Sequence, residues 1–217
     1  MVTILVVSPH LDDAVFSAGQ FLAARPGAVV VTVLAGAPIR PVQTKWDLDS
    51  GFTDSQHAIT IRRDEDRTAL AMLGAIPVHL DYLDCQYKPE NHRALVTGLT
   101  NEIEKRQPEL VVGPLGLGHA DHIRVRDAVL AAHREVPLWL YGDLPYRVRN
   151  PRSVKAALKS IRGRGYAIEE LRRVALGDVE LKTAALACYP SQMKLIEVGK
   201  VMVLERFWRA TRTPDMA

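Results

Sequence analysis

Two short segments of the chain place histidine and aspartate side chains close together. His10, Asp12 and Asp13 fall within four consecutive positions, and His119 and His122 are three positions apart. Imidazole and carboxylate groups are the usual ligands of catalytic zinc, which keeps an open position for water and substrate beside three protein ligands. Such a zinc ion lowers the pKa of its water to about 7 and polarises a carbonyl group. The pattern therefore favours a metal-dependent hydrolase.

If the two segments form one site, their residues divide into metal ligands and catalytic groups. A bend after His10 would bring this ring and Asp13 to a common point and leave Asp12 off the metal, ready to take a proton from the attacking water. Either histidine of the second segment could ligate the metal. A free His119 would face the substrate carbonyl and stabilise the oxyanion or protonate the leaving amine.

Each segment alone also has a simpler explanation. Asp12 or Asp13 could cap the helix that follows, because aspartate is a favoured N-cap residue and its charge suits the helix dipole. Asp121 could hold the His119 ring, but helix capping is its expected role. One histidine of the pair could equally lie on the surface. The position of both segments in the fold decides between these explanations.

Apolar, β-branched runs alternate with amphipathic segments along the chain, which is the pattern of a parallel α/β sheet. Strands are predicted over residues 2–7, 28–34, 77–80, 110–112 and 137–141. Helices are predicted over residues 13–24, 59–73, 92–106 and 121–133. We expect one domain over residues 1–217, with a Rossmann-like three-layer sandwich and a mainly parallel sheet over about 1–145. A smaller C-terminal α+β extension over about 146–217 should hold a helix at 178–188 and a strand near 201–207.

Both histidine segments follow predicted strands, at the edge of the sheet where parallel α/β proteins bind their ligands. The first segment comes directly after residues 2–7, and the second follows residues 110–112. This shared position favours one composite site over two unrelated clusters. Two long segments without clear periodicity, residues 39–57 and 82–91, could cover a pocket at the same edge.

The composition fits a globular protein and excludes several other classes. Of 217 residues, 47% are hydrophobic and 24% are charged, with a net charge of +3. No stretch approaches the roughly 20 apolar residues of a membrane span, and the N-terminal run lacks a basic leader, so we expect a cytoplasmic protein. The two cysteines, Cys85 and Cys188, are predicted to be free thiols. The basic residues over 147–173 could suit an anionic partner or substrate, but a solvated surface is the expected role, and nucleic-acid binding is not indicated.

The two histidine segments resemble the signatures of the PIG-L/LmbE-like N-deacetylase family. Residues 9–13, Pro-His-Leu-Asp-Asp, are similar to its Pro-His-x-Asp-Asp motif, and residues 119–122, His-Ala-Asp-His, to its His-x-Asp-His motif. The resemblance covers most of the chain and implies zinc, or another divalent metal such as Fe²⁺, as cofactor. The ligands that it implies are His10, Asp13 and His122. It further implies Asp12 as the general base and His119 as the electrophilic or acidic partner.

Three further features look like those of the family. Residues 62–65 match an Arg-x-x-Glu pattern, which implies that Arg62 holds substrate hydroxyl or phosphate groups, although Glu65 could equally belong to an exposed helix start. Asp84 resembles a substrate-facing acid, with a turn-forming aspartate as the alternative. Residues 182–192 resemble a C-terminal family helix that ends in Ser-Gln, for which packing is the expected role.

The substrate implied by the resemblance is a small N-acetylated molecule, an amino sugar or a metabolite that contains one. The enzyme would be a monomer or a homo-oligomer. We expect it to bind neither nucleic acid nor a membrane. Two departures from the family pattern concern this substrate. Ala14 stands where the first motif often continues with Glu, and Leu117 stands where members that act on thiol-linked sugars often carry Tyr.

Other functions compete with deacetylation. An amidase for a larger N-acyl group or a thiol conjugate is the alternative among hydrolases. Two histidines and one carboxylate can also hold Fe(II) in a non-heme oxygenase, but the usual β-barrel scaffold of those enzymes differs from an α/β sheet. A nucleotide-binding module is disfavoured because the acidic residues after the first strand would repel a pyrophosphate.

Overall fold

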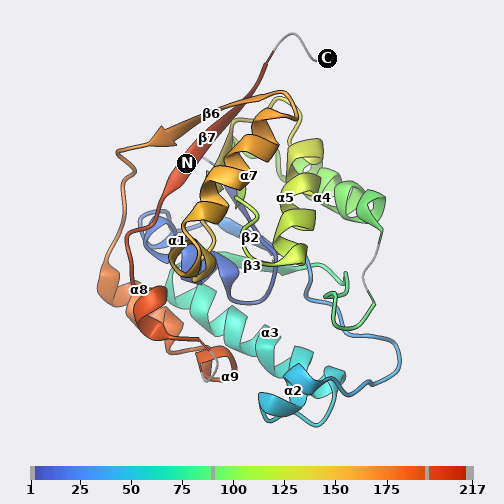
Figure 1. The fold of residues 1–217 in the computed structure, drawn as a ribbon. Helices are drawn as coiled ribbons and strands as arrows, with labels where there is room; N and C mark the ends of the chain where they lie inside the picture. Colours follow the sequence, from blue (N-terminus) through green and yellow to red (C-terminus); the bar gives the residue numbers. More distant parts are fainter. Residues whose placement is uncertain (1–2, 89–90, 194–195, 214–217) are drawn as a thin grey trace.

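The computed structural model describes residues 3–88, 91–193 and 196–213 and contains a seven-stranded sheet (Figure 1). The strand order is β3-β2-β1-β4-β5-β7-β6. β1 to β5 run parallel, whereas β7 is antiparallel to both of its neighbours, β5 and β6. The strands are β1 Ile4–Ser8, β2 Val29–Thr32, β3 Ile76–His79, β4 Leu110–Pro114, β5 Leu138–Tyr141, β6 Tyr166–Leu171 and β7 Phe207–Arg212.

Helices cover both faces of the sheet. α1, α3 and α8 pack on one face, and α4, α5 and α7 pack on the other. These helices are α1 Asp13–Ala23, α3 Ser55–Met72, α4 His92–Arg106, α5 Ala120–Ala132, α7 Arg152–Arg162 and α8 Val179–Leu186. Because both faces are covered, every residue of β1 and β2 is buried, which explains the continuous apolar runs in their sequence. The predicted Rossmann-like three-layer sandwich is confirmed.

The C-terminal α+β extension adds two strands to this same sheet. β6 lies in the basic segment, where no strand was expected, and the predicted strand near residues 201–207 was wrong because β7 only begins at Phe207. The apolar residues 201–203 pack instead as a loop against the layer of α1 and α8. Trp208 and Ala210 of β7 are buried, whereas Arg209 between them is exposed. This alternation is typical of a strand with one face on the core.

A kink inside α1 is held by the C-terminal part of the chain. Ala18 leaves the helical conformation, with φ −142° and ψ 24°. The Glu205 carboxylate accepts hydrogen bonds from the backbone N–H groups of residues 20–21, at 2.8 and 3.0 Å. The Lys182 ammonium group donates to Glu205 at 2.8 Å and to an α1 carbonyl group at 2.9 Å. Both charged side chains are buried, so the pair fixes the direction of the helix that begins at Asp13.

Shorter elements lie around one end of the sheet. They are α2 Lys45–Asp49, α6 Tyr146–Arg149, α9 Pro190–Met193 and a 3-10 turn at Val198–Lys200. α2 lies within the segment over residues 39–57 that was predicted as an irregular cover. Cys85 and Cys188 are free thiols, as predicted. Within the ranges that the structure describes, no helix combines the length and the apolar character needed to cross a membrane.

Candidate active site

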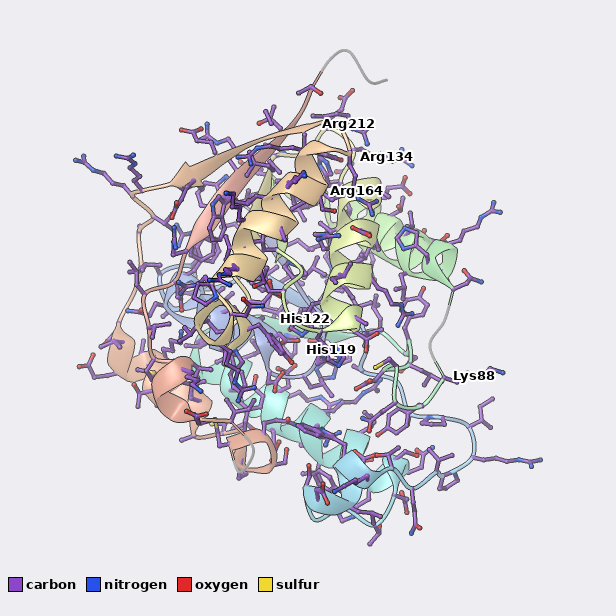
Figure 2. All side chains as sticks on the ribbon, viewed as in Figure 1. Lys88, His119, His122, Arg134, Arg164 and Arg212 are labelled. Atoms are coloured by element: carbon purple, nitrogen blue, oxygen red, sulfur yellow. The ribbon has the colours of Figure 1, made fainter. Side chains whose placement is uncertain are left out.

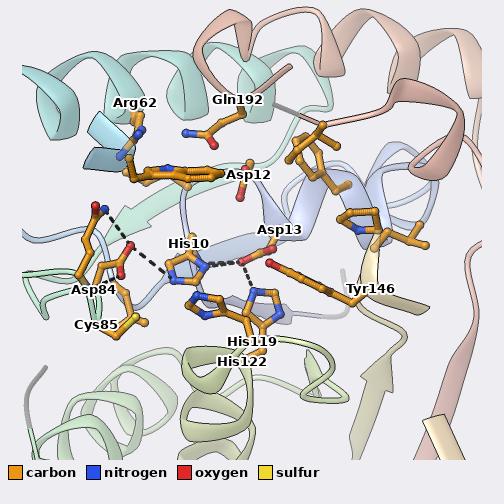
Figure 3. A pocket seen from close by; sticks show the side chains of 18 of the residues that line it. His10, Asp12, Asp13, Arg62, Asp84, Cys85, His119, His122, Tyr146 and Gln192 are labelled. Atoms are coloured by element: carbon orange, nitrogen blue, oxygen red, sulfur yellow. Dashed lines mark hydrogen bonds and ion pairs between the residues drawn. The ribbon is translucent and has the colours of Figure 1, made fainter. Parts of the chain in front are cut away.

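A cavity of about 400 Å³ opens at the carboxyl ends of β1 and β4. These two strands are neighbours, and the sheet continues from them in opposite directions, through β2 and β3 on one side and β5 on the other. Such a reversal of strand order is where open α/β sheets bind ligands. Both histidine segments lie there, and Figure 3 shows their side chains in the cavity.

Asp13 lies between two histidine rings. Its Oδ2 atom is 3.1 Å from Nδ1 of His10 and 3.2 Å from Nε2 of His122. Asp13 and His122 are buried, and His10 is partly exposed. One donor atom from each residue lies within 4.8 Å of the other two. The fold thus brings together the three residues that were predicted as metal ligands.

Each of the two rings has a carboxylate at its other nitrogen. Nε2 of His10 is 3.4 Å from Oδ2 of Asp121, and Nδ1 of His122 is 2.7 Å from Oδ1 of Asp143. Metal-binding histidines usually carry such a partner, because it fixes the tautomer and the orientation of the ring. Two imidazoles and one carboxylate also form a known ligand set of catalytic zinc. The residues present therefore fit a divalent cation.

Two neighbouring groups of donors are also close together, namely His10 with His119 and Asp121, and Asp84 with Cys85 and Asp121. Both groups depend on Asp121. Its carboxylate already accepts hydrogen bonds from the backbone N–H of Cys85 and from the Arg124 guanidinium group. Asp13, in contrast, forms no ion pair with a lysine or arginine of the described residues. The group around Asp13 is therefore the better cation site.

The carboxylates around His122 favour positive charge. Burial opposes the charged form of this ring, but Asp13 and Asp143 outweigh burial and raise the pKa of His122 to about 9. Burial likewise opposes the ionised form of Asp13, but His122 and His10 hold the pKa of Asp13 well below its usual range. The charge of an ionised Asp13 can thus be balanced in two ways, by a proton on the His122 ring or by a divalent cation.

Asp12 lines the same cavity, and helix capping does not explain it. Its side chain makes no cap hydrogen bond to α1 and no hydrogen bond to another described residue. The Ser8 hydroxyl lies at the helix start instead, where it accepts from the backbone N–H of Ala14 at 3.0 Å and donates to the carbonyl of His10 at 2.7 Å. Burial, together with the charge of Asp13, raises the pKa of Asp12 to about 8.

His119 is the N-cap residue of α5 and also lines the cavity. Its Nδ1 atom accepts a hydrogen bond from the backbone N–H of Asp121 at 3.2 Å, which leaves Nε2 as the donor of the neutral ring. Burial, with the charges of His10 and His122, lowers the pKa of His119 and favours this neutral form. The prediction that Asp121 caps the helix was wrong, because His119 takes that position and the buried Asp121 carboxylate contacts His10 instead.

Asp84 both forms a turn and faces the cavity. Its Oδ1 atom accepts from the backbone N–H of Gln86 at 3.0 Å, and its Oδ2 atom lies 3.8 Å from Nε2 of His10. The two explanations offered for this residue are therefore compatible. The turn orients the side chain, and the second oxygen remains within the cavity.

Arg62 lines the cavity, but α2 already holds part of its guanidinium group. The side chain is buried, and Nη1 donates to Oδ1 of Asp47 at 3.0 Å. The other carboxylate oxygen of Asp47 accepts from the Tyr87 hydroxyl at 2.8 Å. Asp47 therefore connects the segment over residues 39–57 to α3 and to the loop that carries Asp84.

A contact between distant parts of the chain forms another wall of the cavity. Glu65 is buried, which excludes the exposed helix start considered for it. Its carboxylate accepts from the backbone N–H of Ser191 at 3.0 Å and from the Ser191 hydroxyl at 2.5 Å. Gln192, the next residue, lines the cavity. Glu65 thus fixes the position of α9 beside the site.

The sequence analysis gave no role to several residues that contact this site. Asp143 follows β5 as the histidine segments follow β1 and β4, so its position at a strand end was an available signal. The Tyr146 ring packs edge-on against His122, with ring centroids 5.1 Å apart. Trp46 of α2 and Arg149 of α6 also line the cavity, and no sequence pattern marked them.

Comparisons with known proteins identify a family and several similar structures. Residues 5–133 match the family model described as PIG-L, GlcNAc-PI de-N-acetylase. The structure of A40926 pseudoaglycone deacetylase shares 29% identity, covers 97% of this chain and 98% of that chain, and has a TM-score of 0.77. A zinc-inhibited form of teicoplanin deacetylase shares 26% identity over 98% and 99% of the two chains, with a TM-score of 0.81. N,N'-diacetylchitobiose deacetylase from Pyrococcus horikoshii shares the fold, at 20% identity over 88% and 70% of the two chains and a TM-score of 0.56. A search of curated protein sequences gave no match.

Proposed function

Because the chain belongs to the PIG-L family, whose model matches residues 5–133, we propose that it is a zinc-dependent hydrolase that removes an N-acetyl group from an amino sugar. One observation carries the proposal. Asp13 lies between His10 and His122, and Asp12 projects into the same cavity without a structural hydrogen bond. Two solved enzymes, A40926 pseudoaglycone deacetylase and teicoplanin deacetylase, match nearly the full length of the chain and support the same reaction.

The proposed reaction divides the work among the residues of the cavity. When held by His10, Asp13 and His122, zinc would polarise the acetyl carbonyl and lower the pKa of the attacking water toward about 7. Asp12 takes the proton from this water as the water attacks, and so acts as general base. A divalent cation held beside Asp12 would offset the charge of Asp13 and favour the ionised form of Asp12; because no described side chain hydrogen-bonds to this carboxylate, its oxygens are then available for that proton.

We assign His119 to the side of the amide carbonyl opposite Asp12. Its ring is 5.3 Å from the His10 ring, and the backbone N–H of Asp121 occupies its Nδ1 atom. Nε2 is therefore the nitrogen that can donate to the developing oxyanion and then protonate the leaving amine. Asp121 and Asp143 act as positioning residues, because each holds one ring of the ligand set through its outer nitrogen.

We infer that the sugar ring contacts the polar side chains beside Asp84. A cavity of about 400 Å³ is within the range of sites that enclose a small ligand. Asp84 and Arg62 lie on the side of the cavity away from Tyr146 (Figure 3). The second oxygen of Asp84 can accept from a sugar hydroxyl. Arg62 lines the cavity on the same side and adds a positive charge near the sugar hydroxyls.

Acetate release from a panel of N-acetylated amino sugars tests the proposal. The panel contains N-acetylglucosamine, its glycosides and the matching N-octanoyl compounds, with zinc at one equivalent because a similar deacetylase was solved in a zinc-inhibited form. We expect acetate and a free amine by mass spectrometry, loss of activity with EDTA and recovery on readdition of zinc. Faster cleavage of the octanoyl compounds, or turnover that EDTA does not change, would contradict the proposal.

A further inference from the structure

A second cavity lies on the other side of α6 from the candidate active site. Its volume is about 480 Å³, and no residue lines both cavities. α6 contributes to each of them: Tyr146 and Arg149 line the active-site cavity, whereas Arg147 and Val148 line the second one. The remaining lining residues come from α7, from the turn before it and from Arg206, just before β7. We call this second cavity the α7 groove.

The α7 groove combines apolar walls with cationic groups. Lys155, Leu158 and Arg162 are three and four positions apart along α7, so they lie on one face of the helix. Ala157 and Ile161, on the adjacent face, are buried against the sheet. Leu158 is consequently only partly buried at the border of the core, with the two charged residues on either side of it along the helix.

Most positive charges in the groove lack an acidic partner. Arg206 pairs with Glu170 at 2.6 Å. Arg147, Lys155 and Arg162 form no ion pair with any residue in the described ranges. By contrast, Arg134 and Arg164, labelled at the far end of the molecule from His119 in Figure 2, pair with Glu104 and Asp127.

Arg147 points to an anion as the missing partner. One of its terminal nitrogens donates to the backbone carbonyl of Leu204, but its buried Nε atom has no hydrogen-bond partner among the described residues. Burial lowers the pKa of Arg147, and so does the charge of Arg206, which also lines the groove; Glu170 and Glu205 oppose this shift only in part. A bound anion would remove this repulsion and satisfy the free N–H donor.

We propose that the α7 groove binds a small organic anion, a sulfate, phosphate or carboxylate that carries an apolar alkyl or aryl group. The cationic side chains match the charged group, and Val154 and Leu158 match the apolar group. The volume suits a small molecule. A membrane surface fits less well, because Val148, Val154 and Leu158 are partly buried and Pro151 is the one exposed apolar residue among those that line the groove. This site is separate from the proposed deacetylase site.

Calorimetric titration of the full chain with naphthalene-1-sulfonate tests this proposal without any need for turnover. Two matched ligands separate the contributions: 1-naphthalenemethanol keeps the ring without the charge, and inorganic sulfate keeps the charge without the ring. Two double variants separate the groove from the rest of α7. Lys155→Gln with Arg162→Gln removes two charges that line the groove, and Arg152→Gln with Lys159→Gln removes two exposed charges of the same helix that do not line it.

We expect one naphthalenesulfonate to bind per chain. Each matched ligand lacks either the charge or the apolar ring and should bind at least about tenfold more weakly. The groove double variant should weaken binding at least about tenfold, and the control double variant less than about twofold. All four substituted residues are exposed, so circular dichroism should show unchanged folding. Absence of saturable binding, or equal losses in the two double variants, would overturn the proposal.

Discussion

The Asp143→Asn substitution tests whether His122 is a metal ligand that Asp143 orients. Asp143 is fully buried after β5; its Oδ1 atom lies 2.7 Å from Nδ1 of His122, and its Oδ2 atom accepts from the backbone N–H of Gly116 at 2.9 Å. Asparagine keeps the shape of the side chain but removes its charge. The His122 ring then loses the carboxylate that fixes its orientation and favours its bond to a cation.

The expected loss can be stated from this geometry. Carboxylate partners of metal-binding histidines typically contribute about 10–100-fold in metal affinity. This range equals about 1.4–2.8 kcal/mol, and we expect the upper half of it because no solvent reaches the Asp143–His122 pair. Competition for zinc with a chromogenic chelator measures the affinity directly. Acetate release at saturating zinc then shows whether turnover recovers when the ion is bound.

Asp66→Asn is the matched control. Asp66 is also buried, and its Oδ2 atom lies 2.8 Å from Nε2 of His79, but neither residue lines the active-site cavity. Both variants should lower the free energy of unfolding by about 1–3 kcal/mol, because each weakens a buried hydrogen bond. Only Asp143→Asn should lower zinc affinity. Unchanged zinc binding in Asp143→Asn, or an equal loss in Asp66→Asn, would refute the reasoning.

Two further substitutions address the parts of the fold that position the site. Asp47→Ala leaves the buried Arg62 guanidinium group without its carboxylate, which should cost about 3–5 kcal/mol of unfolding free energy and raise KM more than it lowers kcat. Urea unfolding measures the first effect and steady-state kinetics the second. An unchanged KM would show that α2 does not shape the cavity. Lys182→Met leaves Glu205 as a buried, unpaired charge at the α1 kink and should also cost about 3–5 kcal/mol in urea unfolding. The control Lys200→Met removes a lysine from a more exposed pair and should leave the unfolding transition nearly unchanged, so equal losses would contradict the role given to burial.

The part of the candidate site that sequence alone predicts is the part made of neighbours in the chain. His10, Asp12 and Asp13 lie within a single turn after β1, and His119 and His122 lie at the start of one helix. The rule that ligands bind at the carboxyl ends of parallel strands then brings the two segments together. The alternation of strands and helices thus predicts one composite site, whereas the choice of His122 over His119 as a ligand came from the resemblance to the PIG-L/LmbE-like family.

The partners of these residues come from distant positions, and among them only Asp143, at the end of β5, carried a signal in the sequence. Asp143 is 21 positions after His122, and Ser191 is 126 positions after its partner Glu65. Such pairs depend on how helices and loops pack, which local periodicity does not encode. The contact of Ser8 with the start of α1 was not anticipated for a related reason, because Ser8 reaches the helix from the end of β1.

The last two strands show the same limit in the fold. β7 places an exposed arginine between Trp208 and Ala210, and β6 lies within a basic segment. Strands that alternate charged and apolar residues in this way carry a weaker apolar signal than β1 or β2, which are buried throughout. β7 is placed in the sheet by pairing with β5, and β6 by pairing with β7. Only the tertiary structure shows these pairings.

The most direct test of the proposed mechanism is a paired measurement on Asp12→Asn. Zinc content and acetate release are measured on the same sample, beside the unsubstituted protein. If Asp12 is the base and His10, Asp13 and His122 are the ligands, the variant keeps one zinc per chain and loses about 10²–10⁴-fold in kcat. A variant that keeps its zinc and turns over at the original rate would contradict the mechanism.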